Sequence, residues 1–422
     1  MANALITNQM IAVESIRLWH NENAFLNNVN GQYNDEFAKA GAKAGQSIRI
    51  RAPVDYIIRT GPTAVVQDTI EPIVNLTVAS QAGVDMSFSS VDRTMTIDKF
   101  SERYIRPAIN VTAGYVAVTL MAASEGGASG WSANVNDTTG ALSSPVAATW
   151  LNAKANLTKA SPPTSDKRIV MDPVTEANTV STLSGLFNSQ PLIAKQYESG
   201  SMMRALGFDW MSDVTAIIHT TGTLATSPTW VPSPVSGWSF GTLNAANQGL
   251  TATSSLTVTA LTGTLKMGDI ICIAGVQGVN RITKQATGRL RNFTVTADVA
   301  SGATAIPIAP PLLGPAAGPV LQPQQTVNAV PATNAVIYSR APASSIYRKN
   351  LAYHPDAITL AMVDLIEPPN VEVSRKSQDT VSVRVLTQYQ GTSDQLLTRL
   401  DILFGQAYLR PEWIEIVPDP VV

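Results

Sequence analysis

Charged residues are scarce in this chain of 422 residues: they make up 14% of it, and the formal net charge is -2. Ordinary soluble domains carry roughly 25% charged residues. No long basic run occurs, so the counterion release that drives tight nucleic-acid binding has little to act on, and sequence-specific DNA binding is not expected. Because little repulsion opposes association, such a surface suits a chain that is buried between neighbours.

Cysteine occurs once, as Cys272 in the apolar run Ile270–Ala274, which excludes a disulfide framework and predicts a small buried hydrophobe. The first residues, Met1–Trp19, lack a basic stretch followed by a continuous apolar run, so we predict no signal peptide. The most apolar helical stretch, Ala113–Ala123, is shorter than the ~20 residues that a membrane span needs. We therefore expect no membrane partner.

Motifs for catalysis and for cofactors are absent or out of context. Neither common phosphate-binding glycine motif occurs, so no cofactor is expected. Gly237–Gly241 matches the G-x-S-x-G pattern of hydrolases, but three prolines precede it and a poor helix follows, and the one downstream histidine, His354, is predicted to be solvated in a loop. His20 and His219 have no carboxylate or cysteine at metal-ligand spacing. We assign no catalytic, cofactor-binding or metal residue.

The length is two to three times the usual domain length of about 150 residues, so several modules are expected. Met1–Gly45 has sparse apolar positions and is predicted to be an arm that docks elsewhere. Gln46–Ile97 alternates with period two, which predicts strands over Val74–Val78 and Val84–Phe88 with a turn at Ser80–Gly83. This excursion has too little apolar surface to fold alone.

The strongest helical signal runs to about Glu125 and contains Pro107, which marks either a kink or the first turn. Its apolar positions recur every three or four residues: Phe100, Tyr104, Ala108, Val111, Tyr115, Val118 and Ala122. Further elements are predicted as helices over 145–160, 175–187 and 190–203 and as strands over 167–172 and 207–214. These segments indicate an α+β region.

From Thr220 to Ser345 the chain is rich in Thr, Ser, Gly, Pro and Val and has little helical periodicity, which predicts a separate β domain. Its expected strands are 256–260, 269–276, 293–296 and 306–308, with 310–323 as an exit loop. Mixed periodicity returns in Tyr347–Val422, with strands over 371–373 and 381–386 and a helix or strand over 394–408. The β domain is therefore interpreted as an insertion into an α+β unit.

Four stretches in this order resemble a known family: Val170–Pro173, Gly185–Trp210, Gly268–Val276 and Phe404–Val417. Together they resemble the coat protein of the short-tailed Salmonella phage type, and the similarity covers most of the chain. The resemblance implies a Hong Kong 97-type capsid fold, which is α+β with a spine helix, peripheral and axial domains, an extended β loop and an N-terminal arm. It also implies an inserted, barrel-like β domain.

By that resemblance, residues 1–45 are the arm, 46–96 the extended loop with peripheral-domain strands, 97–129 the spine helix, 130–222 the first part of the axial domain, 223–345 the insertion, and 346–422 the axial-domain return. The implied function is that of a major capsid protein, and not an enzyme, in the virion of a tailed bacteriophage. Copies would form pentamers and hexamers of an icosahedral shell that encloses double-stranded DNA. Implied partners are a scaffolding protein and a portal protein, with assembly in the bacterial host cytoplasm, and the need for a decoration protein stays open.

Charged residues of the extended excursion are candidates for contacts between subunits: Arg49, Arg51, Arg59, Asp68, Glu71 and Asp85, with Asp55 nearby. A solvated face is the alternative for each of them. Two other functions stay open at this point. One is an encapsulin-like nanocompartment shell on the same fold, and the other is a β-rich adhesin or tail component.

Overall fold

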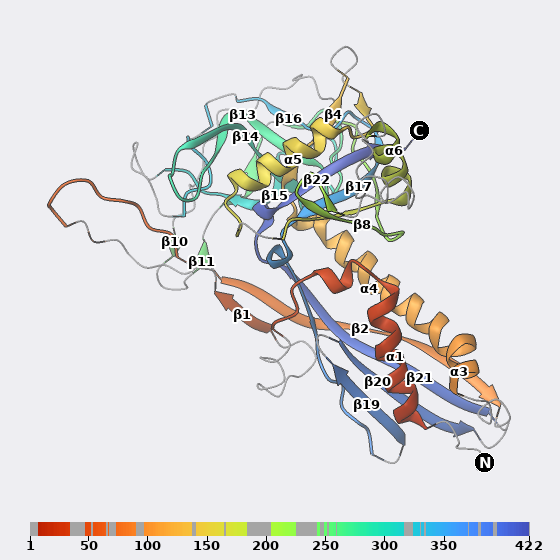
Figure 1. Cartoon of the computed structure of the whole chain (residues 1–422). Coiled ribbons are helices and arrows are strands. Elements are labelled where there is room, and N and C mark those ends of the chain that lie inside the picture. Colours follow the sequence, from red (N-terminus) through yellow and green to blue (C-terminus); the bar gives the residue numbers. More distant parts are fainter. Residues whose placement is uncertain are drawn as a thin grey trace. The chain divides into compact units, whose positions relative to one another are not determined.

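The computed structural model describes residues 7–33, 47–51, 54–64, 66, 73–89, 97–136, 141–163, 166–183, 204–224, 243–244, 249–250, 253–258, 260–315, 324–329, 331–332, 335–369, 371–378, 381–390 and 395–421. It forms two compact units (Figure 1). Unit 1 comprises Met1–Ile50, Asn75–Leu120 and Ile358–Ala407, and unit 2 comprises Arg51–Val74, Met121–Ala357 and Tyr408–Val422. The sequence-based division kept 346–422 together, whereas the fold assigns 358–407 to unit 1.

Unit 1 is built on a sheet with the strand order β1-β2-β21-β20-β19, and β18 also pairs with β21. The strands are β1 (Ser47–Arg51), β2 (Ile73–Ser89), β18 (Ile358–Met362), β19 (Glu372–Gln378), β20 (Val381–Gln390) and β21 (Gln395–Tyr408). The ambiguous segment 394–408 is thus a strand. Its antiparallel pairing with β2, from Gly405 opposite Val78 to Gln395 opposite Ser89, explains why 358–407 group with the β2 region.

The predicted turn at Ser80–Gly83 is wrong, because β2 is one strand of 17 residues. Only a register shift between Val78 and Ser80 interrupts its pairing with β21. Gly83 allows the strands to approach closely: a Cβ there would lie 2.4 Å from the carbonyl oxygen of Leu400. The glycine that suggested a turn therefore serves strand pairing instead.

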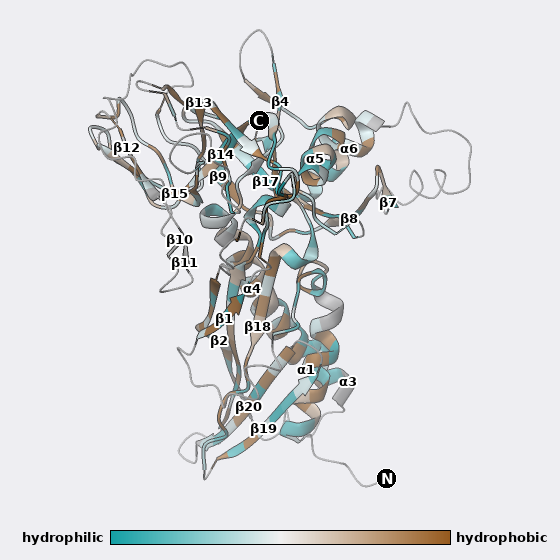
Figure 2. Ribbon diagram, turned by 90° about the vertical axis from the view of Figure 1, so that its left-hand side faces the viewer, coloured by the Kyte–Doolittle hydropathy of each residue, from teal (hydrophilic) through white to brown (hydrophobic). Residues whose placement is uncertain are grey.

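Helix α1 (Asn8–Glu22) contains the arm's apolar residues, and the short helix η1 (Leu26–Asn28) follows it. The Thr7 side chain caps α1 by accepting a hydrogen bond from the backbone of Met10. Ile11, Ile16 and Trp19 are buried where α1 packs against β19 and β20. The ribbon of α1 carries both hydrophobic and hydrophilic colours in Figure 2. The described part of the arm therefore packs on the sheet of its own unit.

The predicted long helix is confirmed, with an irregular start. It consists of α3 (Ile97–Phe100), a π-helical turn η3 (Ser101–Ile105) and α4 (Arg106–Gly127). Pro107 lies in the first turn of α4, where the missing N–H matters least. By length and composition Ser101–Gly127 could cross a membrane, but 53% of the window is buried inside the structure, as in the core helix of a globular protein.

The predicted buried face of this helix is partly wrong. Ile109, Val116 and Leu120 are buried, whereas Val111, Tyr115 and Val118 are 66%, 53% and 42% exposed, although Phe100 and Ala108 are buried as predicted. The helix is apolar on most of its circumference, so the three- and four-residue spacing fits more than one face. The spacing alone could not identify the side that packs.

Unit 2 contains a sheet with the order β3-β22-β17-β6-β8-β7, and β9 also pairs with β17. Its strands are β3 (Gly130–Trp131), β6 (Arg168–Met171), β7 (Arg204–Ala205), β8 (Phe208–Ser212), β9 (Ile218–Thr220), β17 (Ile346–Tyr353) and β22 (Ile414–Pro420). Helices α5 (Ala147–Lys159) and α6 (Pro173–Leu183) match the predicted 145–160 and the start of 175–187. The predicted helix 190–203 lies outside the described residues.

A compact aromatic cluster fixes α5 against this sheet. Trp150 on α5 meets Trp210 on β8 edge to face, with 5.0 Å between ring centroids. Phe208, Ile169 and Val417 belong to the same buried cluster. Such aromatic pairs add about 0.5–1.5 kcal/mol beyond the area that they bury.

The inserted β segment also belongs to unit 2 and forms an antiparallel sheet with the order β12-β15-β14-β13-β16. The strands are β12 (Thr253–Thr257), β13 (Ile270–Val279), β14 (Ala286–Val295), β15 (Ala305–Leu312) and β16 (Ile337–Ser339), of which only β16 was not predicted. They enclose a core of their own that includes Leu256, Ile271 and Phe293. Cys272 is buried, as predicted. The short pairs β4 (Asn134–Val135) with β5 (Leu142–Ser143), and β10 (Leu243–Asn244) with β11 (Gly249–Leu250), lie outside both sheets.

Candidate functional site: a buried ionic cluster at the neck of the inserted domain

The chain enters and leaves the inserted domain through two adjacent segments, residues 221–222 and 344–345, which we call the neck. The flanking strands β9 and β17 pair directly, with Thr220 opposite Ile346. Hydrogen bonds close the neck: the Ser345 amide donates to Thr221 Oγ1 at 2.8 Å, and the Ser344 amide donates to the Gly222 carbonyl at 2.9 Å. A Cβ on Gly222 would lie 2.1 Å from the Thr264 carbonyl oxygen, so this approach requires glycine.

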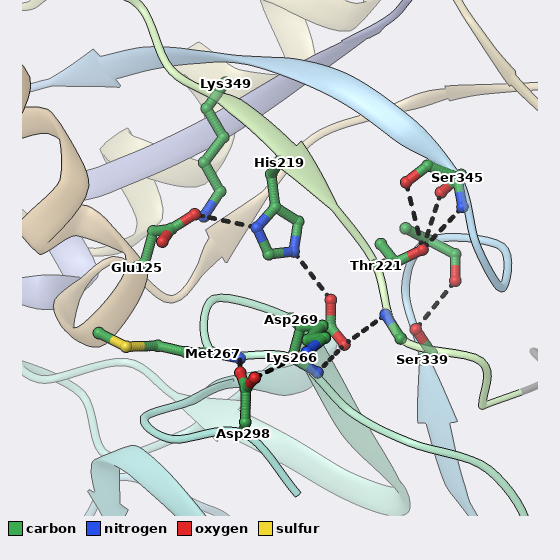
Figure 3. Close-up of polar contacts among 12 residues, drawn as sticks. Glu125, His219, Thr221, Lys266, Met267, Asp269, Asp298, Ser339, Ser345 and Lys349 are labelled. Atoms are coloured by element: carbon green, nitrogen blue, oxygen red, sulfur yellow. Dashed lines mark hydrogen bonds and ion pairs between the residues drawn. The ribbon is translucent and has the colours of Figure 1, made fainter.

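His219 lies beside the neck on β9 and is only 4% exposed. Its Nδ1 is 2.9 Å from Glu125 Oε1 and its Nε2 is 2.9 Å from Asp269 Oδ1 (Figure 3). Glu125 comes from the end of α4, and Asp269 immediately precedes β13 of the inserted domain. The imidazole therefore links two carboxylates that come from different parts of unit 2.

Asp269 also accepts hydrogen bonds from the backbone. Its Oδ2 receives the Lys266 amide at 2.7 Å and the Gly222 amide at 3.1 Å. These bonds tie the turn before β13 to the neck. Because Asp269 is almost fully buried, they replace the water that this carboxylate loses on folding.

Lys349 on β17 supplies the second cation. It is 0% exposed, and its Nζ lies 3.3 Å from Glu125 Oε1, the oxygen that also faces His219. Burial lowers the Lys349 pKa, and the charge of Glu125 only partly offsets this effect. The ring of Tyr347 packs against the ring of His219, with 5.3 Å between the ring centroids.

The electrostatics favour the charged form of His219. Burial lowers its pKa, but the hydrogen bonds to Asp269 and Glu125 outweigh burial, so the pKa of His219 lies above its ordinary value. Burial raises the pKa of Glu125, but the hydrogen bond from His219 and the charge of Lys349 outweigh it, so this pKa is lowered. Both directions fit an ion pair.

A second buried carboxylate, Glu415 on β22, has a different environment. Its Oε2 accepts hydrogen bonds from Ser132 Oγ at 2.8 Å and from Asn156 Nδ2 at 3.3 Å. Burial raises the Glu415 pKa to about 7, and these hydrogen bonds and the charges of Arg289 and Arg340 only partly counteract burial. This carboxyl therefore titrates near neutral pH.

The charged residues predicted for contacts between subunits have different surroundings where the structure describes them. Arg49 and Arg51 lie exposed on β1, and Arg59 donates hydrogen bonds to the carbonyls of Gly61 and Thr63. Asp85 pairs with Arg399 at 3.1 Å, where both side chains are about half exposed. Asp68 and Glu71 lie outside the described residues. Asp55 pairs at 2.6 Å with Arg281 of its own chain.

Sequence reasoning missed the ionic cluster, because its members are far apart in the chain and none stands in a motif. The prediction of a solvated His354 was also wrong: this side chain is buried and packs edge to face on Trp413, 5.6 Å between ring centroids. The hydrolase-like motif 237–241 lies outside the described residues. Within the described part of the chain, no group of three or more His, Cys, Asp or Glu residues is arranged to hold a metal ion.

The family model described as P22 coat protein, gene protein 5, matches residues 25–417. A search of curated proteins finds no match. Solved structures that resemble the chain include Mycobacterium phage Che8, at 11% identity over 93% of this chain and 90% of that chain with a TM-score of 0.41.

Two further solved structures are also similar to this chain. The capsid of Ralstonia phage GP4 is 9% identical over 90% of this chain and 85% of its own, with a TM-score of 0.41. The CUS-3 coat protein I-domain is 26% identical over 27% of this chain and 97% of its own, with a TM-score of 0.20.

Proposed function

Because this chain belongs to the P22 coat protein family and is the major capsid protein of a tailed-phage head, we propose that its copies form the pentamers and hexamers of an icosahedral shell. The protein is a structural subunit of the virion and has the Hong Kong 97-type fold. The family model over residues 25–417 is the observation that carries this assignment.

We also propose which proteins the subunit assembles with. Assembly takes place in the bacterial host cytoplasm around a scaffolding protein, and the shell joins a portal protein. It encloses double-stranded DNA without reading its sequence, consistent with the net charge of -2. The subunit performs no catalysis and needs no cofactor.

Exposed apolar side chains support self-assembly. Tyr56, Ile58 and Val66 of the extended excursion are exposed, as are Val111, Tyr115 and Val118 on α4. Covering apolar surface gains about 25 cal/mol per Å². With few surface charges to oppose association, neighbouring copies are the occupants that fit such surfaces.

Expression of the full chain with and without its scaffolding protein, followed by size exclusion and electron microscopy, tests the proposal. Uniform round shells are the expected product with the scaffold. A stable monomer under all conditions would overturn the assembly proposal.

We also propose that Arg49, Arg51, Arg59, Asp68, Glu71 and Asp85 contact neighbouring subunits. Arg59 is exposed and its hydrogen bonds stay within one short segment, so Arg59→Glu should reduce the yield of shells with little change in the melting temperature of the subunit. The matched control is Arg204→Glu, an exposed arginine on β7. Equal shell yields for the two variants would remove Arg59 from the contact.

A further inference from the structure

The geometry at His219 determines the protonation state of its ring. A carboxylate only accepts hydrogen bonds, and neutral imidazole has one N–H donor. Both ring nitrogens lie 2.9 Å from carboxylate oxygens, of Glu125 on one side and of Asp269 on the other. Both contacts are hydrogen bonds only if both nitrogens carry protons, so the structure calls for an imidazolium.

The charges around the ring balance only in that state. Facing His219 are the carboxylates of Glu125 and Asp269, the ammonium of Lys349 and the phenol of Tyr347. The neighbouring pair Lys266–Asp298, at 2.7 Å, is neutral as a pair. Loss of the imidazole proton leaves two carboxylates and one lysine in a buried site, and a nitrogen lone pair then points at a carboxylate oxygen.

The cluster also joins parts of unit 2 that are covalently linked only through the neck. Asp269 belongs to the inserted domain, Glu125 ends α4, and His219 and Lys349 stand on the flanking strands. Other contacts between the inserted domain and the rest of unit 2 do not involve His219. Thr294 Oγ1 donates to the Ala128 carbonyl, Asn280 Nδ2 donates to the Lys159 carbonyl at 3.1 Å, and Arg281 pairs with Asp55 at 2.6 Å.

We propose that the proton on His219 fastens the inserted β domain to the end of α4, and that its loss loosens the neck. The inserted domain is thus held most firmly in acid, and it becomes mobile as the pH rises. This device acts within one subunit and does not depend on the shell geometry proposed above.

The direction of the pH dependence follows from the linkage between the protonation of His219 and the docking of the inserted domain. The pKa of His219 is raised in the docked state above its ordinary value of 6.5. The stabilisation is therefore complete below pH 6.5 and is lost as the pH rises through the pKa of the docked state. Between these two values the opening equilibrium of the neck should rise about tenfold for each pH unit, because one proton is released.

Hydrogen exchange of the full-length chain, read by mass spectrometry in unassembled subunits and in shells, measures this opening. After correction for the pH dependence of intrinsic exchange, protection of residues 221–222 and 344–345 should fall across this window, while protection of α5 stays constant. Equal protection of the neck at all pH values would overturn the proposal.

A direct observation of the ring needs no variant. The chain has three histidines, so labelling histidine with ¹³C resolves their titrations by NMR. At pH 6.5, where free histidine is half protonated, His219 should show mainly the imidazolium signature. A mainly neutral ring of His219 at that pH would also overturn the proposal.

Variants separate the proton from simple packing. Glutamine at 219 donates to one carboxylate but presents its oxygen to the other, so His219→Gln should open the neck and remove the pH dependence. Asp269→Asn in that background supplies a donor to the glutamine oxygen, while its own oxygen still accepts from Gly222 and Lys266. The double variant should therefore recover protection, again without pH dependence.

His20→Gln, on α1 in unit 1, is the matched control and should behave as the wild type. If His219→Gln keeps both the protection and the pH dependence of the wild type, the proton on His219 does not fasten the neck. If the double variant protects the neck no better than His219→Gln alone, the hydrogen-bond geometry described here is not what holds it.

Discussion

Replacing Glu415 with glutamine should stabilise the subunit above neutral pH and have little effect in mild acid. Glutamine keeps the shape of the side chain and an oxygen that accepts from Ser132 and Asn156, but it removes the buried charge. In the wild type this carboxyl has a pKa of about 7 in the folded chain, against an ordinary value of 4.5. The folded chain thus holds its proton more tightly than the unfolded chain.

The magnitude follows from this difference. Each tenfold change in proton affinity is worth about 1.4 kcal/mol, so moving from 4.5 to about 7 costs the wild type about 3 kcal/mol once the carboxyl is ionised. Because the pKa of this acid is raised on folding, the contribution of Glu415 to stability is most favourable below pH 4.5. It declines as the pH rises to about 7 and changes little above that. Glutamine removes this loss.

Urea unfolding of both proteins at pH 5 and pH 8, followed by the fluorescence of the tryptophans, measures the effect. The free energy of unfolding should differ by about 3 kcal/mol at pH 8 and by less than about 1 kcal/mol at pH 5. Equal pH dependence in the two proteins would refute the reasoning. It would mean that Glu415 keeps an ordinary pKa despite its burial.

Three further predictions concern packing, a buried ion pair and the inserted domain. Gly83→Ala should lower the free energy of unfolding by about 1–3 kcal/mol, because the added Cβ collides with backbone atoms. Gly114→Ala should raise it by up to about 1 kcal/mol, because nothing lies within 4 Å of the added Cβ. Thermal melts of the two variants distinguish these outcomes. Asp401→Ala removes the carboxylate that pairs with Arg384 at 2.6 Å, and it should lower the free energy of unfolding in urea by about 3–5 kcal/mol. Adding Arg384→Met to this variant removes the unpaired charge and should partly restore the stability. Residues 223–345 expressed alone should melt cooperatively by circular dichroism, because their sheet has its own core, and a broad non-cooperative transition would contradict this.

The sequence predicted elements where one local signal dominated. The run Ile270–Ala274 predicted the buried strand β13, and the composition change near Thr220 marked the start of the insertion, because consecutive apolar or β-branched residues specify a strand without help from distant residues. Prediction from the sequence failed where a distant strand or side chain determined the local structure. Gly83 looked like a turn residue, and only the approach of β21 shows why a strand needs glycine there.

The same limit applies to the buried charges. Nothing near His219 in the sequence marks it as an ion, because Glu125, Asp269 and Lys349 reach it from distant segments. A local clue did exist for Lys349, which occupies a position in β17 where an apolar residue is the norm, but a lone lysine in a strand is usually exposed. The tertiary structure alone assembles the cluster.

The direct pairing of β9 with β17 has a consequence for how such chains vary. Because the two strands are hydrogen-bonded neighbours, with Thr220 opposite Ile346, the entire segment between them is topologically the loop of a β-hairpin. Hairpin loops accept changes of length at small entropic cost, since doubling a loop adds only about 0.6 kcal/mol. A change in the length or sequence of this segment therefore leaves both flanking strands, and their pairing, outside the altered part of the chain.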